Sequence, residues 1–374
     1  MSLCAIICEY NPLHRGHLWQ IEQAKQRFDA VVCLMSGSFV QRGEPAILDK
    51  FTRARWALEA GADAVFELPC AYVLQSAEGF AAGGARLAAA VGATHLCFGS
   101  ETQDVALLRC LARLCVQEFD SLRPVLSHFL SGGLSYPAAF QSAVQQVYPV
   151  FPNDVFLPNA LLGVEYLKAI ERYALPLTPV ALPRCLPVSA TRCRAQAEQG
   201  AYPDVPPFVA SQLANGPLVR FAGLAPSLLY KLRMMDQADF AALPFVSEGL
   251  ENRLYHAARH AVTLEELLDL CQTKRYPLAR LKRLLCCALL GITHDDLLRA
   301  NQTGPAYARL LALDPQSRTV RECLKRCPVP VCTTGLAAET YRGSALDRRA
   351  TDLHALFSGR PCGLDYTVPL FTGA

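Results

Sequence analysis

The chain has 374 residues, of which 52% are hydrophobic and 18% are charged, and its formal net charge is +3. This composition excludes a largely disordered chain and provides enough apolar side chains for two domains with buried cores. No apolar run is long enough to span a bilayer, and the N-terminus lacks a basic segment followed by a cleavable apolar one, so we expect a cytoplasmic protein.

The first chemical signature is the turn from Glu9 to His17. It follows an apolar run at residues 3–8, typical of a buried strand, and precedes an amphipathic stretch typical of a helix. The N-terminus of a helix has free N–H groups and a partial positive charge, so it favours a phosphate. Gly16 allows a ligand to approach the backbone closely, and His14 and His17 can both donate hydrogen bonds to that phosphate. In the alternative interpretation, the two histidines are incidental to a turn.

Strands and helices alternate through the first half of the chain. Apolar β-runs lie at residues 31–35, 64–68, 95–98 and 177–182, and helical patterns lie at residues 50–60 and 77–91. This alternation predicts an α/β fold with a Rossmann-like parallel sheet and helices on both of its faces. Ligands of such sheets bind at the carboxyl ends of the strands. Small-residue turns at 36–38 and 99–101 fall at that edge with the first signature, and together they favour a nucleotide pocket.

A second cluster, Ser189, Thr191 and Arg194, precedes a polar helical segment. Its hydroxyl groups can bond to phosphate oxygens, and Arg194 can grip a pyrophosphate. In the alternative interpretation, Ser189 or Thr191 only caps the helix and the arginine is solvated. Taken together, the two clusters resemble the paired signature of the nucleotidyltransferase superfamily, in which the first motif holds the triphosphate and the second closes over it.

The character of the chain changes near residue 205, after a proline-rich linker. We predict an ATP-binding, nucleotidyltransferase-like domain at residues 1–205 and a mainly α-helical domain at residues 206–374. Beyond residue 200 the chain has 20 lysines and arginines against 16 carboxylates, and five of these cations surround one tyrosine at residues 273–283. A basic helix start with a tyrosine available for stacking suits RNA, although a solvated charged surface is the alternative. The candidate RNA contacts are Lys274, Arg275, Tyr276, Arg280 and Arg283.

The sixteen cysteines are scattered along the expected strands and helices. Their one cluster, Cys323, Cys327 and Cys332, contains no histidine, so we predict no metal site in the protein. Reduced and mostly buried thiols, acting as small apolar residues, explain the cysteine content.

Nearly the whole chain resembles the tRNA(Met) cytidine acetate ligase family. The matching stretches are residues 9–17, 35–46, 49–53, 61–63, 67–69, 98–101, 158–159, 163–166, 189–194 and 273–283. The resemblance implies an ATP-dependent ligase that activates free acetate as acetyl-adenylate and releases pyrophosphate. It then transfers the acetyl group to N4 of the wobble cytidine of elongator tRNA(Met), forming N4-acetylcytidine. The basic segment would bind the tRNA, and neither a protein partner nor a membrane is indicated.

The same resemblance implies the positions that bind ATP. In the first half of the chain these are Ile7, Cys8, Glu9, Tyr10, Asn11, Pro12, His14, Gly16, His17, Leu18, Gly99, Asn159 and Arg184, to which the second cluster adds Ser189, Thr191 and Arg194. His14 and His17 would stabilise the reacting α-phosphorus centre, and Lys50, Arg53 or Arg194 would offset the phosphate charge. Mg²⁺ is expected to accompany ATP, held largely by the phosphates and by water.

One feature departs from the family pattern. Family members usually have a longer segment, with a Tyr-His-Asp-like element, between the positions of Arg184 and Ser189, and this chain is short there. Two other functions stay open: a small-molecule adenylyltransferase of the cofactor-synthesis type, and a non-catalytic RNA-binding protein on a degenerate form of the fold. The large basic second domain argues against the first of these, and the presence of both histidines and both phosphate clusters argues against the second.

Overall fold

The computed structural model describes residues 1–117, 119–184 and 188–373. Within this part of the chain the strands are β1 (Leu3–Cys8), β2 (Ala30–Ser36), β3 (Phe39–Val40), β4 (Glu44–Pro45), β5 (Ala64–Leu68), β6 (His95–Ser100), β7 (Thr178–Pro183), β8 (Ala308–Leu313) and β9 (Val331–Cys332). The predicted β-runs at residues 31–35, 64–68, 95–98 and 177–182 are confirmed as β2, β5, β6 and β7, with boundaries that differ by at most two residues.

Helices make up most of the remaining described structure. They are α1 (Arg15–Lys25), α2 (Lys50–Glu59), α3 (Cys70–Val73), α4 (Ala77–Ala90), α5 (Val105–Gln117), α6 (Phe119–Ser131), α7 (Tyr136–Val147), α8 (Pro158–Arg172), α9 (Ala190–Glu198), α10 (Pro207–Asn215), α11 (Ala225–Met234), α12 (Gln237–Ala241), α13 (Leu250–His260), α14 (Leu264–Cys271), α15 (Leu278–Leu290), α16 (His294–Thr303), α17 (Arg318–Lys325), α18 (Gly335–Ala338), α19 (Ser344–Phe357) and α20 (Leu364–Thr367), with 3₁₀ turns η1 (Asn153–Phe156) and η2 (Phe221–Leu224). Over the described ranges, no helix is both long enough and apolar enough to cross a membrane.

The central sheet has the strand order β7-β6-β1-β2-β5-β8-β9 among the described residues. The strands from β7 to β5 pair in parallel, and β8 pairs antiparallel to β5. The chain runs outward from β1 through β2 to β5 and then returns to β6 on the other side of β1. This reversal is a topological switch point, where connections leave adjacent strands in opposite directions and open a crevice for a ligand.

Strand β1 is buried on both of its faces. Leu3 and Ala5 face a core that includes residues of α4 and α8, while Cys4 and Ile6 face a core that includes residues of α1 and α2. A strand that is covered on both faces has a continuous apolar sequence, which is typical of a parallel sheet. The packing therefore fixes β1 firmly and sets the position of the turn that follows Cys8.

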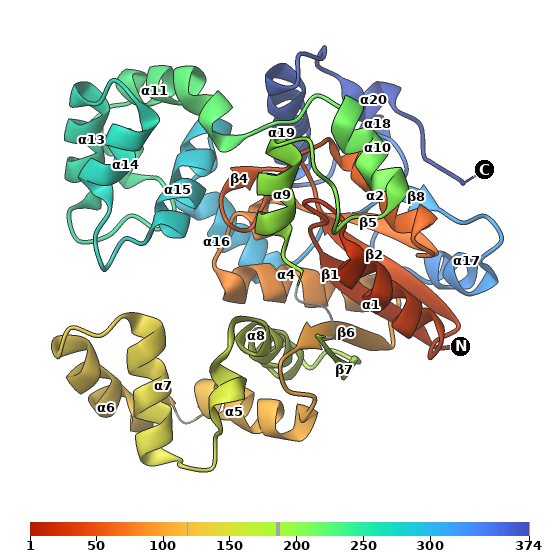
Figure 1. Ribbon diagram of the computed structural model, residues 1–374, viewed down its shortest axis with the longest axis horizontal. Helices are drawn as coiled ribbons and strands as arrows, with labels where there is room; N and C mark the ends of the chain where they lie inside the picture. Colours follow the sequence, from red (N-terminus) through yellow and green to blue (C-terminus); the bar gives the residue numbers. More distant parts are fainter. Residues whose placement is uncertain (118, 185–187, 374) are drawn as a thin grey trace.

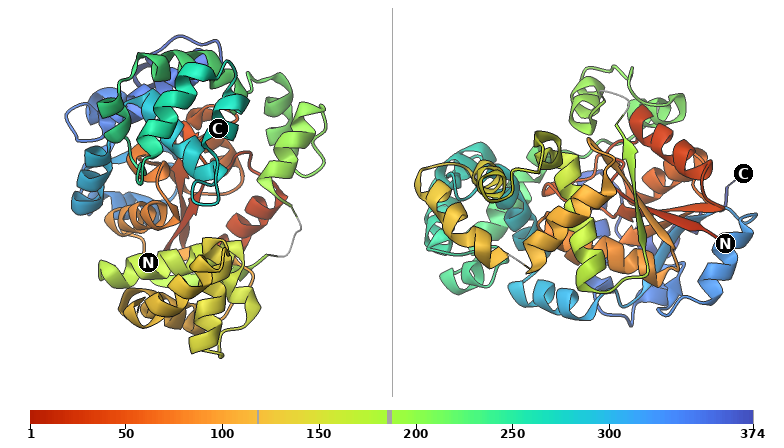
Figure 2. Two further views of the ribbon diagram at one scale, coloured as in Figure 1. Left: turned by 90° about the vertical axis from the view of Figure 1, so that its left-hand side faces the viewer. Right: turned by 90° about the horizontal axis from the view of Figure 1, so that it is seen from below.

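Two groups of helices project from the same side of the sheet. Figure 1 shows α6 and α7 in one group and α11, α13 and α14 in the other, and the left view of Figure 2 places the yellow helices and the green-to-blue helices on opposite sides of the red strands. The helices α11–α15 have a hydrophobic core of their own, built around Leu228, Leu254, Leu267 and Leu284. The prediction of an α/β fold followed by a mainly helical region is therefore confirmed.

The predicted boundary at residue 205 does not separate the sheet from the rest of the chain. Strands β8 and β9 come from the region expected to form the second domain, and β8 pairs with β5 of the first. The short apolar run at residues 308–313 lies among helical patterns, so it gave no clear strand signal. The division into domains at residues 1–205 and 206–374 stays a prediction.

The hairpin β3–β4 joins the second group of helices to the sheet. At Gly43, which has a φ of +77°, a Cβ atom would lie 2.2 Å from the backbone nitrogen of Arg283 on α15. The ammonium group of Lys282 lies 2.5 Å from the carboxylate of Glu44, and the thiol of Cys286 donates to the carbonyl of Gly43 at 3.2 Å. Only glycine permits this close approach, so the hairpin and α15 form one contact.

Candidate active site

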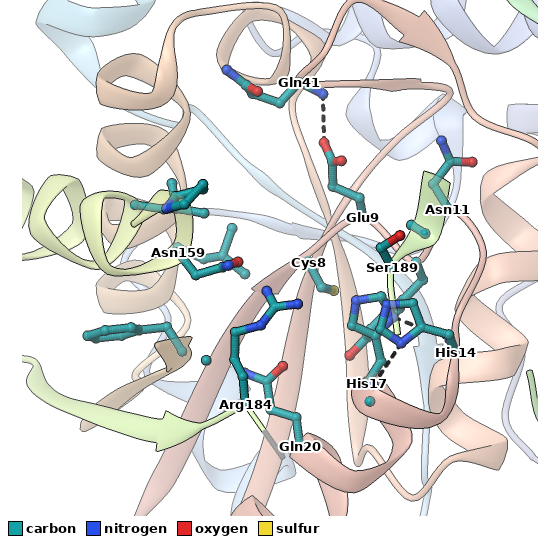
Figure 3. Close-up of a pocket in the computed structure, with 18 of the residues that line it drawn as sticks. Cys8, Glu9, Asn11, His14, His17, Gln20, Gln41, Asn159, Arg184 and Ser189 are labelled. Atoms are coloured by element: carbon teal, nitrogen blue, oxygen red, sulfur yellow. Dashed lines mark hydrogen bonds between the residues drawn. The ribbon is translucent and has the colours of Figure 1, made fainter. Parts of the chain in front are cut away.

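A pocket of about 610 Å³ lies at the switch point, where the carboxyl ends of β1, β6 and β7 meet the first turns of several helices. The predicted ATP-binding residues that line it are Ile7, Cys8, Glu9, Tyr10, Asn11, His14, Gly16, His17, Gly99, Asn159, Arg184, Ser189, Thr191 and Arg194. The fold thus brings the two signature clusters, which are far apart in the sequence, into one pocket. Figure 3 shows Asn159 and Arg184 on one side of it and the two histidines on the other.

His14 and His17 stack on one another at the start of α1 (Figure 3). Their ring centroids are 3.6 Å apart and their planes differ by 14°. Nδ1 of His14 accepts the backbone N–H of His17, and Nδ1 of His17 accepts the backbone N–H of His14, each at 3.3 Å. The two imidazoles thereby replace the Ser/Thr and Glu/Gln side chains of a capping box and satisfy two free N–H groups. The helix start itself holds the pair in place.

Both imidazoles are neutral near pH 7. Burial lowers the pKa of His14 to about 4, and repulsion from Arg184 adds to the effect. Burial, with His14 beside it, lowers the pKa of His17 well below its usual range. Because Nδ1 of each ring accepts a backbone N–H, the one ring proton lies on Nε2. Each ring can therefore donate a hydrogen bond from Nε2 to an oxyanion while its other nitrogen caps the helix.

Gly16 makes room for this pair of rings. A Cβ atom at residue 16 would lie 3.1 Å from Cε1 of His14, closer than most such contacts. Gly16 therefore accommodates the His14 ring and also lines the pocket, and the close approach of a ligand to its backbone stays a prediction.

The first turns of four helices in the described structure reach the pocket. Besides α1, these are α4 through Ala77, α8 through Asn159 and α9 through Ala190 and Thr191. Each helix N-terminus contributes a partial positive charge, and the N–H groups of its first turn that the caps leave unused can donate to a ligand. A pocket that receives four of them favours a polyanion such as a triphosphate.

The wall opposite the histidines comes from β6, β7 and α8. The carboxylate of Glu101 accepts the side-chain amide of Asn159 at 2.5 Å and the backbone N–H of Ala160 at 2.7 Å. Glu101 thereby caps α8 and orients the amide of Asn159, whose oxygen atom is left for a ligand. Arg184 follows β7 directly and brings an exposed guanidinium group to the same wall.

Helix α9 closes the pocket from a third side. Ser189 is the N-cap of this helix, because its hydroxyl accepts the backbone N–H of Arg192 at 3.2 Å. Arg194 donates to the carbonyl of Asn11 at 2.8 Å and to the hydroxyl of Thr191 at 3.3 Å. Ser189 therefore caps the helix and also lines the pocket, and Arg194 ties the second cluster to the first, while contact with a phosphate stays a prediction.

Several lining residues were not foreseen from the sequence. Gln20, Gln41, Arg42, Glu44 and Tyr166 all line the pocket. Gln20 lies three residues after His17, so helical spacing was a usable signal for it. The backbone N–H of Gln41 donates to the carboxylate of Glu9 at 2.6 Å (Figure 3), a contact between the β3–β4 hairpin and the end of β1 that no local pattern indicates.

Lys50 does not reach the pocket, and its predicted role against phosphate charge is corrected. Its side chain is fully buried, with the ammonium group 2.6 Å from Glu67 and 2.9 Å from Asp365. A cation that is already neutralised by two buried carboxylates has no charge left for a ligand. Lys50 instead joins β5 to α20 near the C-terminus.

Arg53 is also removed from the predicted catalytic set. Its fully buried guanidinium donates to the carbonyls of Glu9 at 2.7 Å and Ser36 at 3.0 Å, and also to the carbonyl of Gly37. These bonds hold the ends of β1 and β2 together. The turn at residues 36–38, which we expected at the nucleotide pocket, does not line it.

Two residues of the first motif lie outside the pocket. Leu18 follows His17 by one position, which turns its side chain toward the core beneath α1. Pro12 is buried in the turn and does not line the pocket. The shortened segment after Arg184 includes residues 185–187, which lie outside the described residues.

The basic segment before α15 differs from its prediction. Tyr276 is only 7% exposed, and its hydroxyl donates to the carbonyl of Ser247 at 2.7 Å, so it is not available to stack on a base. Arg280 donates to the carbonyl of Phe245 at 2.6 Å, and Arg283 donates to the carbonyl of Gln41 at 3.3 Å.

Lys274 and Arg275 are the exposed cations of this segment. The Arg275 side chain is 75% exposed beside Glu248. The segment is therefore partly structural, and its first two cations form its accessible part.

Known proteins match this chain over most of its length. The model of the HIGH nucleotidyl transferase family matches residues 1–363. The tRNA(Met) cytidine acetate ligase of Acetivibrio thermocellus is 36% identical, and the match covers 87% of this chain and 86% of that protein. For the ligase of the same name from Syntrophomonas wolfei, the identity is 32% and the coverage is 98% and 99%.

Solved structures agree as well. The crystal structure of Thermotoga maritima TmcAL bound with alpha-thio ATP matches with a TM-score of 0.90 and 27% identity, over 100% of both chains. The apo form of the same protein matches with a TM-score of 0.91. The chain therefore belongs to the tRNA(Met) cytidine acetate ligase family, within the HIGH nucleotidyl transferases.

Proposed function

We propose that this chain is an ATP-dependent ligase that activates acetate as acetyl-adenylate and transfers the acetyl group to N4 of the wobble cytidine of elongator tRNA(Met). The observation that carries the proposal is the pair of neutral imidazoles, His14 and His17, in a pocket that four helix N-termini enter. The names of the relatives and the alpha-thio ATP of the T. maritima structure support the same substrates. With tRNA as its substrate, the enzyme would act in the cytoplasm.

The first step needs charge stabilisation rather than a protein nucleophile. An oxygen of the acetate carboxylate attacks the α-phosphorus of ATP, the bond from that phosphorus to the bridging oxygen breaks, and pyrophosphate leaves. Catalysis then depends on positioning the two reactants and on donors aimed at the reacting phosphate. Nε2–H of His14 and of His17 would supply those donors, while Arg184 and Arg194 would offset the charge of the triphosphate.

The pocket suits Mg²⁺ that is carried by ATP. Glu9 and Glu44 are the carboxylates among its described lining residues, and Glu44 is already paired with Lys282. So few free carboxylates do not form a dedicated cage, and Mg²⁺ in nucleotide sites commonly keeps several waters and phosphate ligands. When bound, the ion would neutralise charge on the departing pyrophosphate.

For tRNA, we propose the exposed part of the basic segment as one contact. Lys274 and Arg275 lie on the surface of the second helix group, where they can reach backbone phosphates. Arg280 and Arg283 would support this contact indirectly, because they hold the neighbouring loop and the β3–β4 hairpin in place.

The test is an incubation of the protein with ATP, Mg²⁺, radiolabelled acetate and total bacterial tRNA, with nucleoside analysis of the product. We expect pyrophosphate release that depends on acetate, and label in N4-acetylcytidine of elongator tRNA(Met). Adenylyl transfer to a small nucleotide without any labelled tRNA would instead favour a small-molecule adenylyltransferase. Binding of tRNA without pyrophosphate release would leave only an RNA-binding protein.

A further inference from the structure

Acetyl transfer from the adenylate requires a proton acceptor. The N4 amine of cytidine attacks the acetyl carbonyl as a neutral amine, and the product amide has one proton fewer on that nitrogen. Any acceptor in the protein must be a titratable group that lines the pocket and has an unused lone pair at working pH.

Most of these side chains do not qualify. His14 and His17 use Nδ1 to cap α1 and carry their proton on Nε2, so near pH 7 they donate and do not accept. Both oxygens of the Glu44 carboxylate face cations, Oε1 toward Lys282 at 2.5 Å and Oε2 toward Arg194 at 3.8 Å. Burial raises the pKa of Tyr166 above its usual range, so its hydroxyl keeps its proton.

Cys8 and Tyr10 are excluded for the same reason. Burial raises the pKa of the Cys8 thiol and of the Tyr10 hydroxyl well above their ordinary values. The hydroxyl of Tyr10 also contacts the sulfur of Cys33 at 3.2 Å, away from the pocket. Among the described lining residues, Glu9 is the remaining candidate.

Glu9 is built into the pocket with one oxygen atom free. It follows β1 directly, and its backbone carbonyl accepts a hydrogen bond from Arg53 at 2.7 Å. Its Oε1 accepts the backbone N–H of Gln41 at 2.6 Å. No other hydrogen bond or ion pair engages this carboxylate among the described residues. In Figure 3 the side chain projects from the end of β1 toward Gln41, which fixes the carboxylate and leaves Oε2 for a ligand.

We propose that Glu9 is the general base of the acetyl-transfer step. The bond between N4 and the acetyl carbon forms, and the bond between that carbon and the phosphate oxygen of AMP breaks with AMP leaving. The proton passes from N4 to Oε2 of Glu9 and then to water. This inference rests on the proposed function and adds a role for Glu9 beyond ATP binding.

The charged surroundings of Glu9 set how the step depends on pH. Arg53 from α2, Arg194 from α9 and Arg42 from the β3–β4 hairpin face it, and Tyr166 lies on α8. Burial raises the pKa of Glu9, and the three arginines oppose that effect without cancelling it. The carboxylate form is therefore lost at a higher pH than for an exposed glutamate, and the transfer rate should fall as the pH drops through that range.

The test separates the two chemical steps. Enzyme, ATP and radiolabelled acetate are mixed first, pyrophosphate is measured, and tRNA is then added in single-turnover amounts. We expect Glu9→Gln to reduce acetyl transfer on the order of 10²–10³-fold and to reduce pyrophosphate release far less, by the part of ATP binding that depends on Glu9, so that acetyl-adenylate accumulates. Glu9→Asp should restore part of the transfer. The control Glu22→Gln removes an exposed carboxylate from α1 and should change neither step.

Three results would overturn the role of Glu9. If wild-type enzyme acetylates tRNA and Glu9→Gln transfers the acetyl group at the same rate, Glu9 is not the general base. The proposed function would still stand. An equal loss of both steps would assign the carboxylate to ATP or Mg²⁺ binding. If Glu9→Gln does not fold, the wild-type pH profile decides: a transfer rate that stays flat as the pH is lowered would contradict a carboxylate base. Wild-type enzyme that never acetylates tRNA would overturn the proposed function as well.

Discussion

The start of α1 and the start of α15 both gather polar side chains at a helix N-terminus, but they use those side chains differently. In α1, each imidazole satisfies a backbone N–H through Nδ1 and still has Nε2 for a ligand. At α15, Tyr276 and Arg280 direct their polar groups to the carbonyls of Ser247 and Phe245. A motif therefore indicates a binding role only when its side chains have polar atoms that are not already hydrogen-bonded within the local structure.

The same distinction separates two sets of cations. Lys50 and Arg53 are fully buried and lie outside the pocket, whereas Arg184 and Arg194 line it. Sequence alone does not distinguish them, since all four are single basic residues near a strand end or a helix start.

The largest expected effect comes from removing one of the two buried cations. Lys50→Met leaves Glu67 buried without a cation and leaves Asp365 with Arg309 alone, 3.5 Å away, so we expect the free energy of unfolding to fall by about 3–5 kcal/mol. Urea denaturation measures the change. Lys325→Met is the control, because the side chains of Lys325 and its partner Glu322 are 68% and 33% exposed, and surface pairs contribute about 0–1 kcal/mol. Full stability of Lys50→Met combined with lost pyrophosphate release would return Lys50 to catalysis.

The next effect tests the exposed nitrogen of each imidazole. His14→Asn retains a good N-cap residue, and His17→Gln retains a side chain that can close the capping box, but both remove Nε2–H. Each should reduce acetate-dependent pyrophosphate release on the order of 10²–10³-fold, with little change in the midpoint of thermal unfolding. His256→Ala on α13, which replaces an exposed histidine, serves as the control. Near-wild-type release by either folded variant would exclude that ring from the reaction.

A smaller effect concerns stability against pH. The pKa of His14 is lowered by burial from 6.5 to about 4 in the folded protein. The stability that depends on neutral His14 is therefore fully present above pH 6.5 and is lost as the pH falls toward 4, because the unfolded chain binds the proton more readily. Between pH 6.5 and pH 4 the free energy of unfolding should therefore decrease by about 1–3 kcal/mol less in His14→Asn than in the wild type. Parallel pH curves for the two proteins would show that His14 is not held neutral.

The smallest effect concerns tRNA binding. Replacing Lys274 and Arg275 with Ala should weaken tRNA binding several-fold and lower the slope of log affinity against log salt by about 0.7–0.9 per lost phosphate contact. ATP-dependent pyrophosphate release should survive. The control replaces Arg318 and Lys325 on α17, which Figure 1 places on the opposite side of the molecule from α13 and α14. If the slope of log affinity against log salt is the same for both variants and the wild type, the basic segment does not contact tRNA and is a solvated charged surface.

Much of the fold was predictable because its signals are local. The apolar runs that became β2, β5, β6 and β7 are continuous, and the turn after β1 joins them at one sheet edge. Strand β8 was missed because its pairing with β5 depends on residues more than 200 positions away along the chain. Burial of Lys50 depends in the same way on Asp365, which belongs to α20.

In the site too, the features that depend on local sequence were predictable and those that depend on distant residues were not. The stacked histidines follow from H-x-x-H spacing at a helix start, and Ser189 follows from cap chemistry. The contact between Gln41 and Glu9, by contrast, depends on a hairpin held by α15. A sequence pattern gives the residue type but not the partner that such a contact requires.

The protonation state of the histidine pair is the property on which the proposed adenylation chemistry most depends. It can be measured by ¹⁵N NMR of protein labelled at histidine, with His14→Asn and His17→Gln used to assign the signals. At pH 7 we predict two neutral rings protonated on Nε2, which stay neutral as the pH is lowered toward 5. Imidazolium signals at pH 7, or rings protonated on Nδ1, would contradict the assignment of both imidazoles as neutral donors to the phosphate.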